Sequence, residues 1–156
     1  MSLTEADFPP IGPWRGYRPD YRGAVVIPVD PAGRVLLQLR DHNPAAVHPG
    51  EWGLFGGEIE GDEALNEAAR RELTEETGIE APLSAFAPFA RIVSPVSKRR
   101  LYVFEAHLDI APVDVRLAEG AGFGFIEPRD FAALPLLGAV RILLSHWAQG
   151  RSRRSP

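Results

Sequence analysis

The chain has 156 residues, the size of one compact domain with one hydrophobic core. Apolar residues make up 45% and charged residues 24%, which excludes disorder and fibrous low complexity, and the absence of cysteine excludes disulfide frameworks, thiolate zinc sites and cysteine nucleophiles. The net charge of −4 is too small, and of the wrong sign, to indicate nucleic-acid binding by itself. The sequence contains neither an apolar stretch of about 18 residues nor a signal-peptide pattern, so we expect a cytoplasmic protein without membrane contact.

The two ends of the chain differ in composition from its middle. Residues 1–20 hold four prolines and two glycines between Phe8 and Pro19, which predicts an extended N-terminal arm that lies on the main domain. Residues 150–156 are polar and cationic, and we predict a flexible basic tail there rather than a nucleic-acid patch. The main domain is therefore expected over residues 21–149.

In the main domain, short strands are expected before and after one long helix. Apolar alternation and turn signals predict strands at 24–29, 34–40, 86–93, 101–108 and 123–126, with a short apolar run at 52–55. Helices are predicted at 62–77, 128–134 and 139–147, the first with Asp62 as its N-cap and Gly78 as its C-terminal stop. This order indicates a mixed β-sheet flanked by helices, an α+β fold in an α/β/α sandwich arrangement.

The central helix carries an unusual distribution of charge. Among its acidic residues, Glu72, Glu75 and Glu76 fall within an arc of about 100° on the helix surface. Leu65 and Ala68 project into the same sector, so these carboxylates are aimed at the body of the protein. They also crowd the C-terminal turn, where the helix dipole disfavours negative charge. Carboxylates placed in this way need cations, which marks a candidate functional site; an ordinary acidic surface helix is the competing interpretation.

The types of donor atom indicate which cation suits this site. Three carboxylates, with no cysteine in the chain and no histidine nearby in the sequence, suit a hard ion such as Mg²⁺ or Mn²⁺. Gly56, Gly57 and Gly61 lie just upstream and leave room for a backbone approach that supplies a carbonyl ligand or receives a phosphate.

Residues 57–79 resemble the Nudix box, which reads G-x5-E-x7-R-E-U-x-E-E-x-G-U with U an aliphatic residue. The match begins at Gly57 and continues with Glu63 and with the run from Arg71 to Ile79, at every defined position. The rest of the chain fits the MutT-like members of this family more loosely, through its hairpin and its later strands. One departure is Phe55, where many relatives have proline, and we expect it to alter the loop into the helix and not the chemistry.

The resemblance implies an activity and a cofactor. Nudix hydrolases cleave a nucleoside diphosphate linked to a further group, using divalent cations held by the box glutamates. Carried over to this sequence, Glu72, Glu75 and Glu76 are the expected metal ligands, the Gly57 carbonyl is a further one, and Mg²⁺ or Mn²⁺ is the expected cofactor.

The resemblance also implies supporting roles for other residues of the box. Arg71 is expected to orient a glutamate, and it lies one turn from both Glu67 and Glu75. Glu63 would be structural at the start of the helix, where the dipole favours a carboxylate. Leu73 and Ile79 would belong to the core.

The expected reaction is metal-assisted attack of water on phosphorus in a diphosphate bridge. The general base stays open between a box glutamate and an acid on a later loop. Glu105 lies within a predicted strand and Glu127 precedes a proline, whereas Glu119 lies in a loop that leads into a strand. We therefore favour Glu119 as an auxiliary ligand or base, with a plain loop acid as the alternative.

Substrate contacts are less well defined by the sequence. Candidates for a nucleobase or sugar pocket are Arg40, Trp52, Phe55 and Arg91, and beyond these Tyr21, Arg22, His42 and His48, each of which also fits packing or surface. We expect a small nucleotide substrate, in first place a nucleoside triphosphate, with nucleotide sugars, ADP-ribose and RNA 5′ ends as alternatives.

Other classes of function fit the sequence less well. A non-catalytic binding module of this fold would normally have lost box glutamates, and the familiar isomerase of this fold uses a cysteine that this chain lacks. Dimers are frequent among relatives, so a homodimer is a further expectation.

Overall fold

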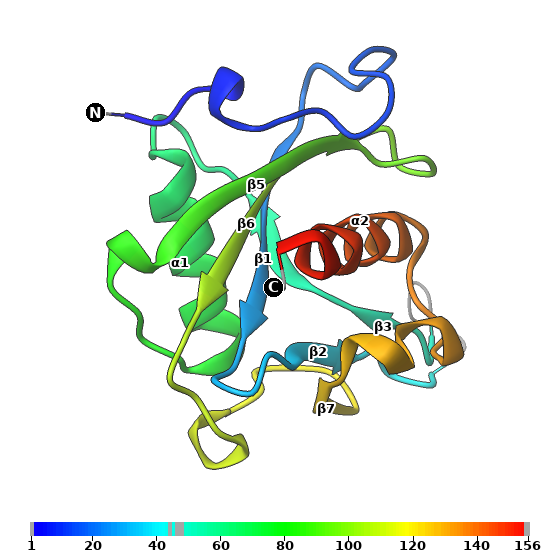
Figure 1. Ribbon diagram of the computed structural model, residues 1–156. Helices are drawn as coiled ribbons and strands as arrows, with labels where there is room; N and C mark the ends of the chain where they lie inside the picture. Colours follow the sequence, from blue (N-terminus) through cyan, green and yellow to red (C-terminus); the bar gives the residue numbers. More distant parts are fainter. Residues whose placement is uncertain (1, 44, 46–48, 155–156) are drawn as a thin grey trace.

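The protein folds into three layers, with a mixed β-sheet between two helices (Figure 1). The computed structural model describes residues 2–43, 45 and 49–154. Helix α1 (Leu65–Thr77) covers one face of the sheet and helix α2 (Gly138–Arg154) covers the other. This confirms the predicted sandwich of helices around a mixed sheet. In the described part of the chain, no helix has the length and apolar character that crossing a membrane requires.

Seven strands, counted over the described residues, join in one sheet. They are β1 (Arg22–Val29), β2 (Val35–Leu39), β3 (Trp52–Gly53), β4 (Phe55–Glu58), β5 (Phe86–Val93), β6 (Arg100–His107) and β7 (Gly122–Ile126). Their order is β3-β2-β1-β6-β5, with β4 paired to β1 and β7 paired to β2. Short 3₁₀ helices also occur, namely η1 (Glu5–Asp7), η2 (Leu83–Ala85), η3 (Pro112–Asp114) and η4 (Pro128–Ala133).

Strand β1 is the centre of the molecule, because both of its faces are covered. Ala24 and Val26 pack toward α1, whereas Ile27 and Val29 pack toward α2, as the two-residue period of a strand requires. The strand pairs in parallel with β6 along its whole length and antiparallel with β4. A nearly continuous apolar run is what a strand buried on both faces needs.

Helix α1 begins three residues later than predicted. Its first residue is Leu65, so Asp62 is not its N-cap. The preceding residues form a turn in which the backbone N–H of Glu63 donates to the Glu60 carbonyl at 3.1 Å and the Glu63 carboxylate accepts from the Glu60 N–H at 2.8 Å. The predicted C-terminus is confirmed, because Gly78 adopts a left-handed φ of 72° and donates its N–H to Thr74.

The N-terminal arm lies along the outer edge of β5, as the blue segment in Figure 1 shows. Its backbone exchanges two hydrogen bonds with Arg91, from Ile11 N–H at 2.9 Å and to the Pro9 carbonyl at 3.0 Å. Phe8 is fully buried and makes edge-to-face contacts with Tyr102 and Phe104. The arm therefore contributes to the core and covers a sheet edge that would otherwise be open.

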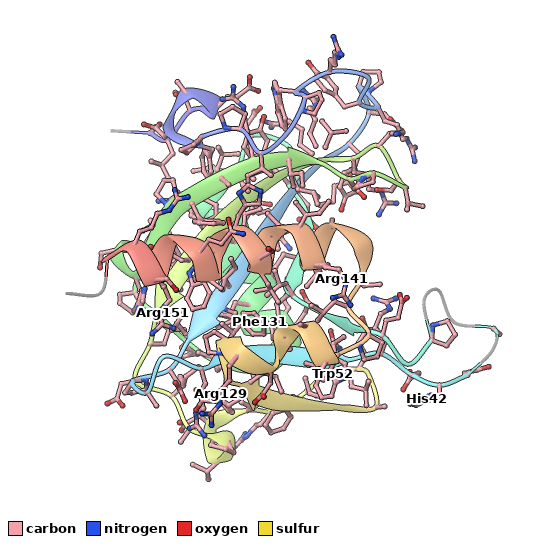
Figure 2. All side chains as sticks on the ribbon, turned by 45° about the vertical axis from the view of Figure 1, so that its right-hand side comes forward. His42, Trp52, Arg129, Phe131, Arg141 and Arg151 are labelled. Atoms are coloured by element: carbon pink, nitrogen blue, oxygen red, sulfur yellow. The ribbon has the colours of Figure 1, made fainter. Side chains whose placement is uncertain are left out.

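The C-terminal segment differs from the flexible basic tail that the sequence predicts from residue 150. Helix α2 continues through Arg154, and residues 155–156 lie outside the described residues. Arg151, labelled in Figure 2, donates to the Gly33 carbonyl at 2.6 Å, and its guanidinium lies 4.9 Å from the centre of the Trp147 ring. These contacts fix the end of the helix to the turn between β1 and β2.

We expect Arg151→Ala to lower the free energy of unfolding by roughly 1–2 kcal/mol, because it removes one charge-assisted hydrogen bond and one cation–π contact. Urea unfolding followed by circular dichroism measures the change. Arg153→Ala is the matched control, since Arg153 is exposed on the same helix. Equal stability of the two variants would mean that Arg151 does not hold the helix end.

Candidate active site

The C-terminal half of α1 rests against the backbone of β4. The Gly56 N–H donates to Glu76 Oε1 at 2.8 Å. A Cβ at Gly57 would collide with the carboxylate of Glu72, so only glycine leaves space for that side chain beside the strand. The glycine pair of β4 and two box glutamates thus meet, although a loop and most of a helix separate them in the sequence.

The three predicted carboxylates are not equally buried. The Glu72 side chain is 14% exposed and Glu76 is half-buried, whereas the Glu75 side chain is 59% exposed. Two of the acids therefore face the body of the protein as predicted. Glu75 instead lies at the solvent side of the cluster, at the edge of the arc that the helix period defines.

Arg71 organises this end of the helix through several hydrogen bonds. Its guanidinium binds the Glu63 carboxylate at 2.5 Å, Glu72 at 2.7 Å and Glu75 at 3.4 Å. It also donates to the Glu58 carbonyl at 3.0 Å. The expected pairing with Glu75 is therefore present, and the alternative pairing with Glu67 is not, because the Glu67 carboxylate accepts from the Ala64 N–H at the start of the helix.

The pKa values of these groups follow from their partners. The hydrogen bond with Glu63 is the largest cause of a raised pKa at Arg71, and the same bond lowers the pKa of Glu63. This pair stays charged over the ordinary pH range. Glu63 thus has a structural role, as predicted, but it acts by holding Arg71 and not by interacting with the dipole of a helix that begins after it.

Glu76 is an acid of this cluster whose pKa is raised. Burial is the largest cause, and with the charges of Glu72, Glu119 and Glu75 it raises the pKa from 4.5 to about 7 against the opposing Gly56 hydrogen bond. The cluster therefore has more negative charge than its own residues neutralise.

Of the acids on later loops, the structure brings Glu119 to this cluster. The Ala118 N–H donates to the Glu76 carbonyl at 3.1 Å, and the Glu119 carbonyl accepts from Gln38 at 2.8 Å, which fixes the loop beside the end of α1. The Glu119 side chain is exposed. Glu105 lies on the opposite face of the sheet, where it accepts a hydrogen bond from Trp147 at 2.9 Å.

A cavity of about 510 Å³ opens next to Gly56 and Gly57 on the α2 side of the sheet. Apolar side chains from the sheet and from α2 form much of its wall, and two arginines, Arg40 and Arg99, lie along it. A volume of this size is typical of a small-molecule site. The other lining residues are Tyr21, Gly23, Val25, Leu54, Phe55, Ser94, Val96, Ser97, Leu101, Leu137, Gly138, Ala139, Val140 and Leu143.

The structure brings only part of the predicted substrate contacts to this cavity. Arg40 lines it, and Phe55 borders it, but the Phe55 side chain is fully buried in the core under α1. Trp52 (Figure 2) packs instead beside Gly124 of β7. Arg91 binds the N-terminal arm, with its guanidinium 5.2 Å from the Trp14 ring and a hydrogen bond to the Glu5 carbonyl at 2.7 Å. His48 lies outside the described residues.

Sequence reasoning missed the contribution of the turn between β5 and β6, including Arg99, to the cavity. The sequence does contain a basic turn at residues 98–100. However, its position becomes clear only from the sheet, where β1 lies between β4 and β6 and so brings this turn to the same pocket as the glycine pair. A second hollow of about 580 Å³ follows the outward face of α1, along the charged side chains Glu63, Arg71 and Glu75. It lies on the solvent side of the helix, so we assign the ligand pocket to the cavity beside Gly57.

The donor set around the glycine pair suits a hard divalent cation. Glu72, Glu75, Glu76 and the Gly57 carbonyl provide oxygen atoms only, the donor type that such a cation prefers. Within the described residues, no three carboxylates or histidines are arranged as a ready metal-binding group, because Glu72 is engaged by Arg71 and Glu75 faces solvent. The types of donor atom therefore suit a metal ion, whereas the positions of Glu72 and Glu75 would have to change to bind one.

Comparison with known proteins finds a matching family model and several related proteins. The NUDIX domain model matches residues 20–139. The nucleoside triphosphatase NudI from Salmonella paratyphi B is 46% identical over 121 residues, which cover 71% of this chain and 84% of that protein. NudI from Escherichia fergusonii is 26% identical over 131 residues, which cover 78% of this chain and 93% of that protein.

Solved structures share the fold. A NUDIX hydrolase from Nitrosomonas europaea aligns with a TM-score of 0.71 at 21% identity, covering 90% of this chain and 76% of that chain. The MutT protein from Methanosarcina mazei Go1 aligns with a TM-score of 0.64 at 21% identity, covering 86% of this chain and 96% of that chain. At this identity the likeness concerns architecture alone.

We expect the stability of the metal-free protein to fall between about pH 4.5 and pH 7 because of Glu76. Its folded-state pKa of about 7 lies above its ordinary 4.5, so folding favours the protonated acid, and this stabilisation is lost as the pH rises through that window. Glu76→Gln should remove this part of the slope, a difference of roughly 1–3 kcal/mol in the free energy of unfolding between pH 4.5 and pH 8. Urea unfolding at both pH values, with exposed Glu80→Gln as control, measures it. Parallel profiles for Glu76→Gln and wild type would contradict the assignment.

Proposed function

The chain belongs to the NUDIX family of hydrolases, and from this premise we propose that it cleaves a diphosphate linkage in a nucleoside triphosphate in a reaction that depends on Mg²⁺ or Mn²⁺. The observation that carries the proposal is the contact of Glu72 and Glu76 with the glycine pair of β4, because the same two glycines line a pocket of about 510 Å³. Carboxylates and a pocket wall share one short stretch of backbone there. A cation-bridged phosphate chain and the nucleoside attached to it need that combination.

One further observation favours nucleoside triphosphates. Relatives that match over most of their length are named nucleoside triphosphatases. The pocket has the volume of a site for one small molecule, which suits a nucleotide. Nucleotide sugars, ADP-ribose and RNA 5′ ends remain the alternatives.

The proposed chemistry assigns a task to each carboxylate. Glu72, Glu75, Glu76 and the Gly57 carbonyl would hold the cation, which when bound neutralises phosphate charge and lowers the pKa of water. Arg71 keeps Glu72 and Glu75 in place through its hydrogen bonds. The attacking water bonds through its oxygen to phosphorus, its proton passes to a carboxylate, and the bond from phosphorus to the bridging oxygen breaks.

We expect Glu75→Gln to reduce metal-dependent turnover at least about a hundredfold, because it removes a charged ligand at nearly constant volume. The fold should stay intact, since the Glu75 side chain is 59% exposed. Release of phosphate and pyrophosphate from nucleoside triphosphates, nucleotide sugars, ADP-ribose and 5′-triphosphorylated RNA measures the loss and identifies the substrate class. Thermal stabilisation by Mn²⁺ alone should fall in the same variant, which tests metal binding independently of the substrate.

The control for this prediction is Glu80→Gln, which changes the charge by the same amount at an exposed position beyond the helix. Normal turnover by Glu75→Gln on a substrate that the wild type hydrolyses would remove the role proposed for α1.

The identity of the general base is tested by Glu119→Gln. If Glu119 accepts the proton, kcat should fall by roughly 10²–10⁴ and the acid limb of its pH profile should disappear, while stabilisation by Mn²⁺ stays largely unchanged. A kcat within about threefold of wild type would assign the base to a box glutamate instead.

A further inference from the structure

Three arginines of the β5–β6 hairpin lie over three aromatic rings of the N-terminal segment. These contacts form a ladder that begins at the outer edge of the sheet and ends at the ligand pocket. The distances from guanidinium carbon to ring centre are 5.2 Å for Arg91 over Trp14, 4.5 Å for Arg100 over Tyr17 and 4.3 Å for Arg99 over Tyr21.

Two of these arginines use their hydrogen-bond donors on the arm. Arg91 donates to the Glu5 carbonyl at 2.7 Å, and Arg100 donates to the Pro19 carbonyl at 3.0 Å. Arg99 differs, because no acceptor among the described residues binds its guanidinium. The nearby carboxylate of Asp20 is bound by Arg18 at 2.7 Å.

The Arg99–Tyr21 pair lies along the same pocket as the glycine pair that the carboxylates contact. Both side chains line the pocket. A Cβ built on Gly23 would lie 3.0 Å from the Tyr21 ring and 3.4 Å from the Gly57 carbonyl oxygen, so the ring and that carbonyl both border Gly23. The charges of Glu58 and Glu72 are also near enough to act on the Tyr21 hydroxyl.

We propose that Arg99, supported on the Tyr21 ring, binds the phosphate chain of the nucleotide and sets the preference for triphosphates. This rests on the proposed function. A planar guanidinium matches two phosphate oxygens at once, and one that is already stacked loses little freedom on binding. The position along the same pocket as the glycine pair favours phosphate over nucleobase, because the phosphates must approach Glu72 there and need cationic groups beside them.

The N-terminal arm supplies the positioning. Arg18 N–H donates to the Lys98 carbonyl at 2.8 Å, and Lys98 adopts a left-handed φ of 58°, which is uncommon outside glycine. Ser94 N–H closes the same turn by donating to the Arg99 carbonyl at 2.9 Å. The arm therefore holds the residue before Arg99 in a conformation that the turn alone would not favour.

The test is equilibrium binding, measured by calorimetry with Mg²⁺ present. The probes are the α,β-methylene analogues of the four nucleoside triphosphates, which resist cleavage at that bridge, and the four nucleoside monophosphates. Arg99→Gln should weaken binding of the triphosphate analogue about 10- to 100-fold, the loss of one or two hydrogen bonds to a charged group, with monophosphate binding less affected. Arg99→Lys should be intermediate, because it keeps the charge without the fork.

Further variants separate the contact from its support. Tyr21→Leu removes the ring and should show part of the Arg99→Gln defect, whereas Tyr21→Phe keeps the ring and should show a smaller defect than Tyr21→Leu. Arg15→Gln is the matched control, because it removes one exposed positive charge from the same arm. Thermal unfolding of each variant shows whether a change in binding reflects a change in fold.

The outcomes are distinct. Unchanged triphosphate binding by folded Arg99→Gln, an equal loss for monophosphates and triphosphates, or the absence of binding by the wild type would each overturn the proposal. Binding that depends on Arg99 without any turnover that depends on Glu75 would sustain the phosphate contact and reject the proposed hydrolysis.

Discussion

Two carboxylates at the C-terminal end of α1 press against the glycine pair of β4, and this contact determines what the neighbouring elements must provide. Negative charge at that end of a helix is disfavoured by the dipole and by burial. Arg71 and the Gly56 N–H offset part of the cost, and the raised pKa of Glu76 shows that part remains. The helix keeps its position because its apolar side chains are packed in the core and because Gly78 ends it sharply. A bound cation would supply the missing charge.

Short-range patterns account for what could be predicted from the sequence. Helix α1 depends on residues within a few turns of one another, including its apolar period, its glycine stop and its box acids. Spacing alone therefore predicts the helix and the face on which Glu72 lies. The fold class follows from the order of strands and helices. The start of α1 could not be predicted from local sequence. Glu63 bonds to Glu60 and to Arg71, so residues 60–63 form a turn before the helix, and Asp62 does not cap it.

Contacts between distant residues account for the differences. The end of α2 is helical because Arg151 meets Gly33, 118 residues away in the chain, and nothing local signals that partner. Arg91 and Arg99 belong to one hairpin, and Arg91 is the one that the sequence analysis favours as a substrate contact, yet Arg91 is engaged by the arm and Arg99 lines the pocket. Which arginine meets a ligand depends on where the arm lies, and this is a property of tertiary packing alone.

The region matched by the family model begins at residue 20, so most of the arm lies outside it. The arm nevertheless inserts Phe8 into the core and bonds to Lys98 in the turn that borders the pocket. The carboxylates of α1 and the proposed phosphate contact are therefore held by different parts of the chain. Within the arm, Arg18 acts on the β5–β6 turn, whereas changes in α1 alter the charge of the cluster. Phe8 links the two parts, because it packs in the same core cluster as the buried face of α1. Substrate preference can therefore be altered through the exposed part of the arm, whereas a change at Phe8 acts on the helix as well.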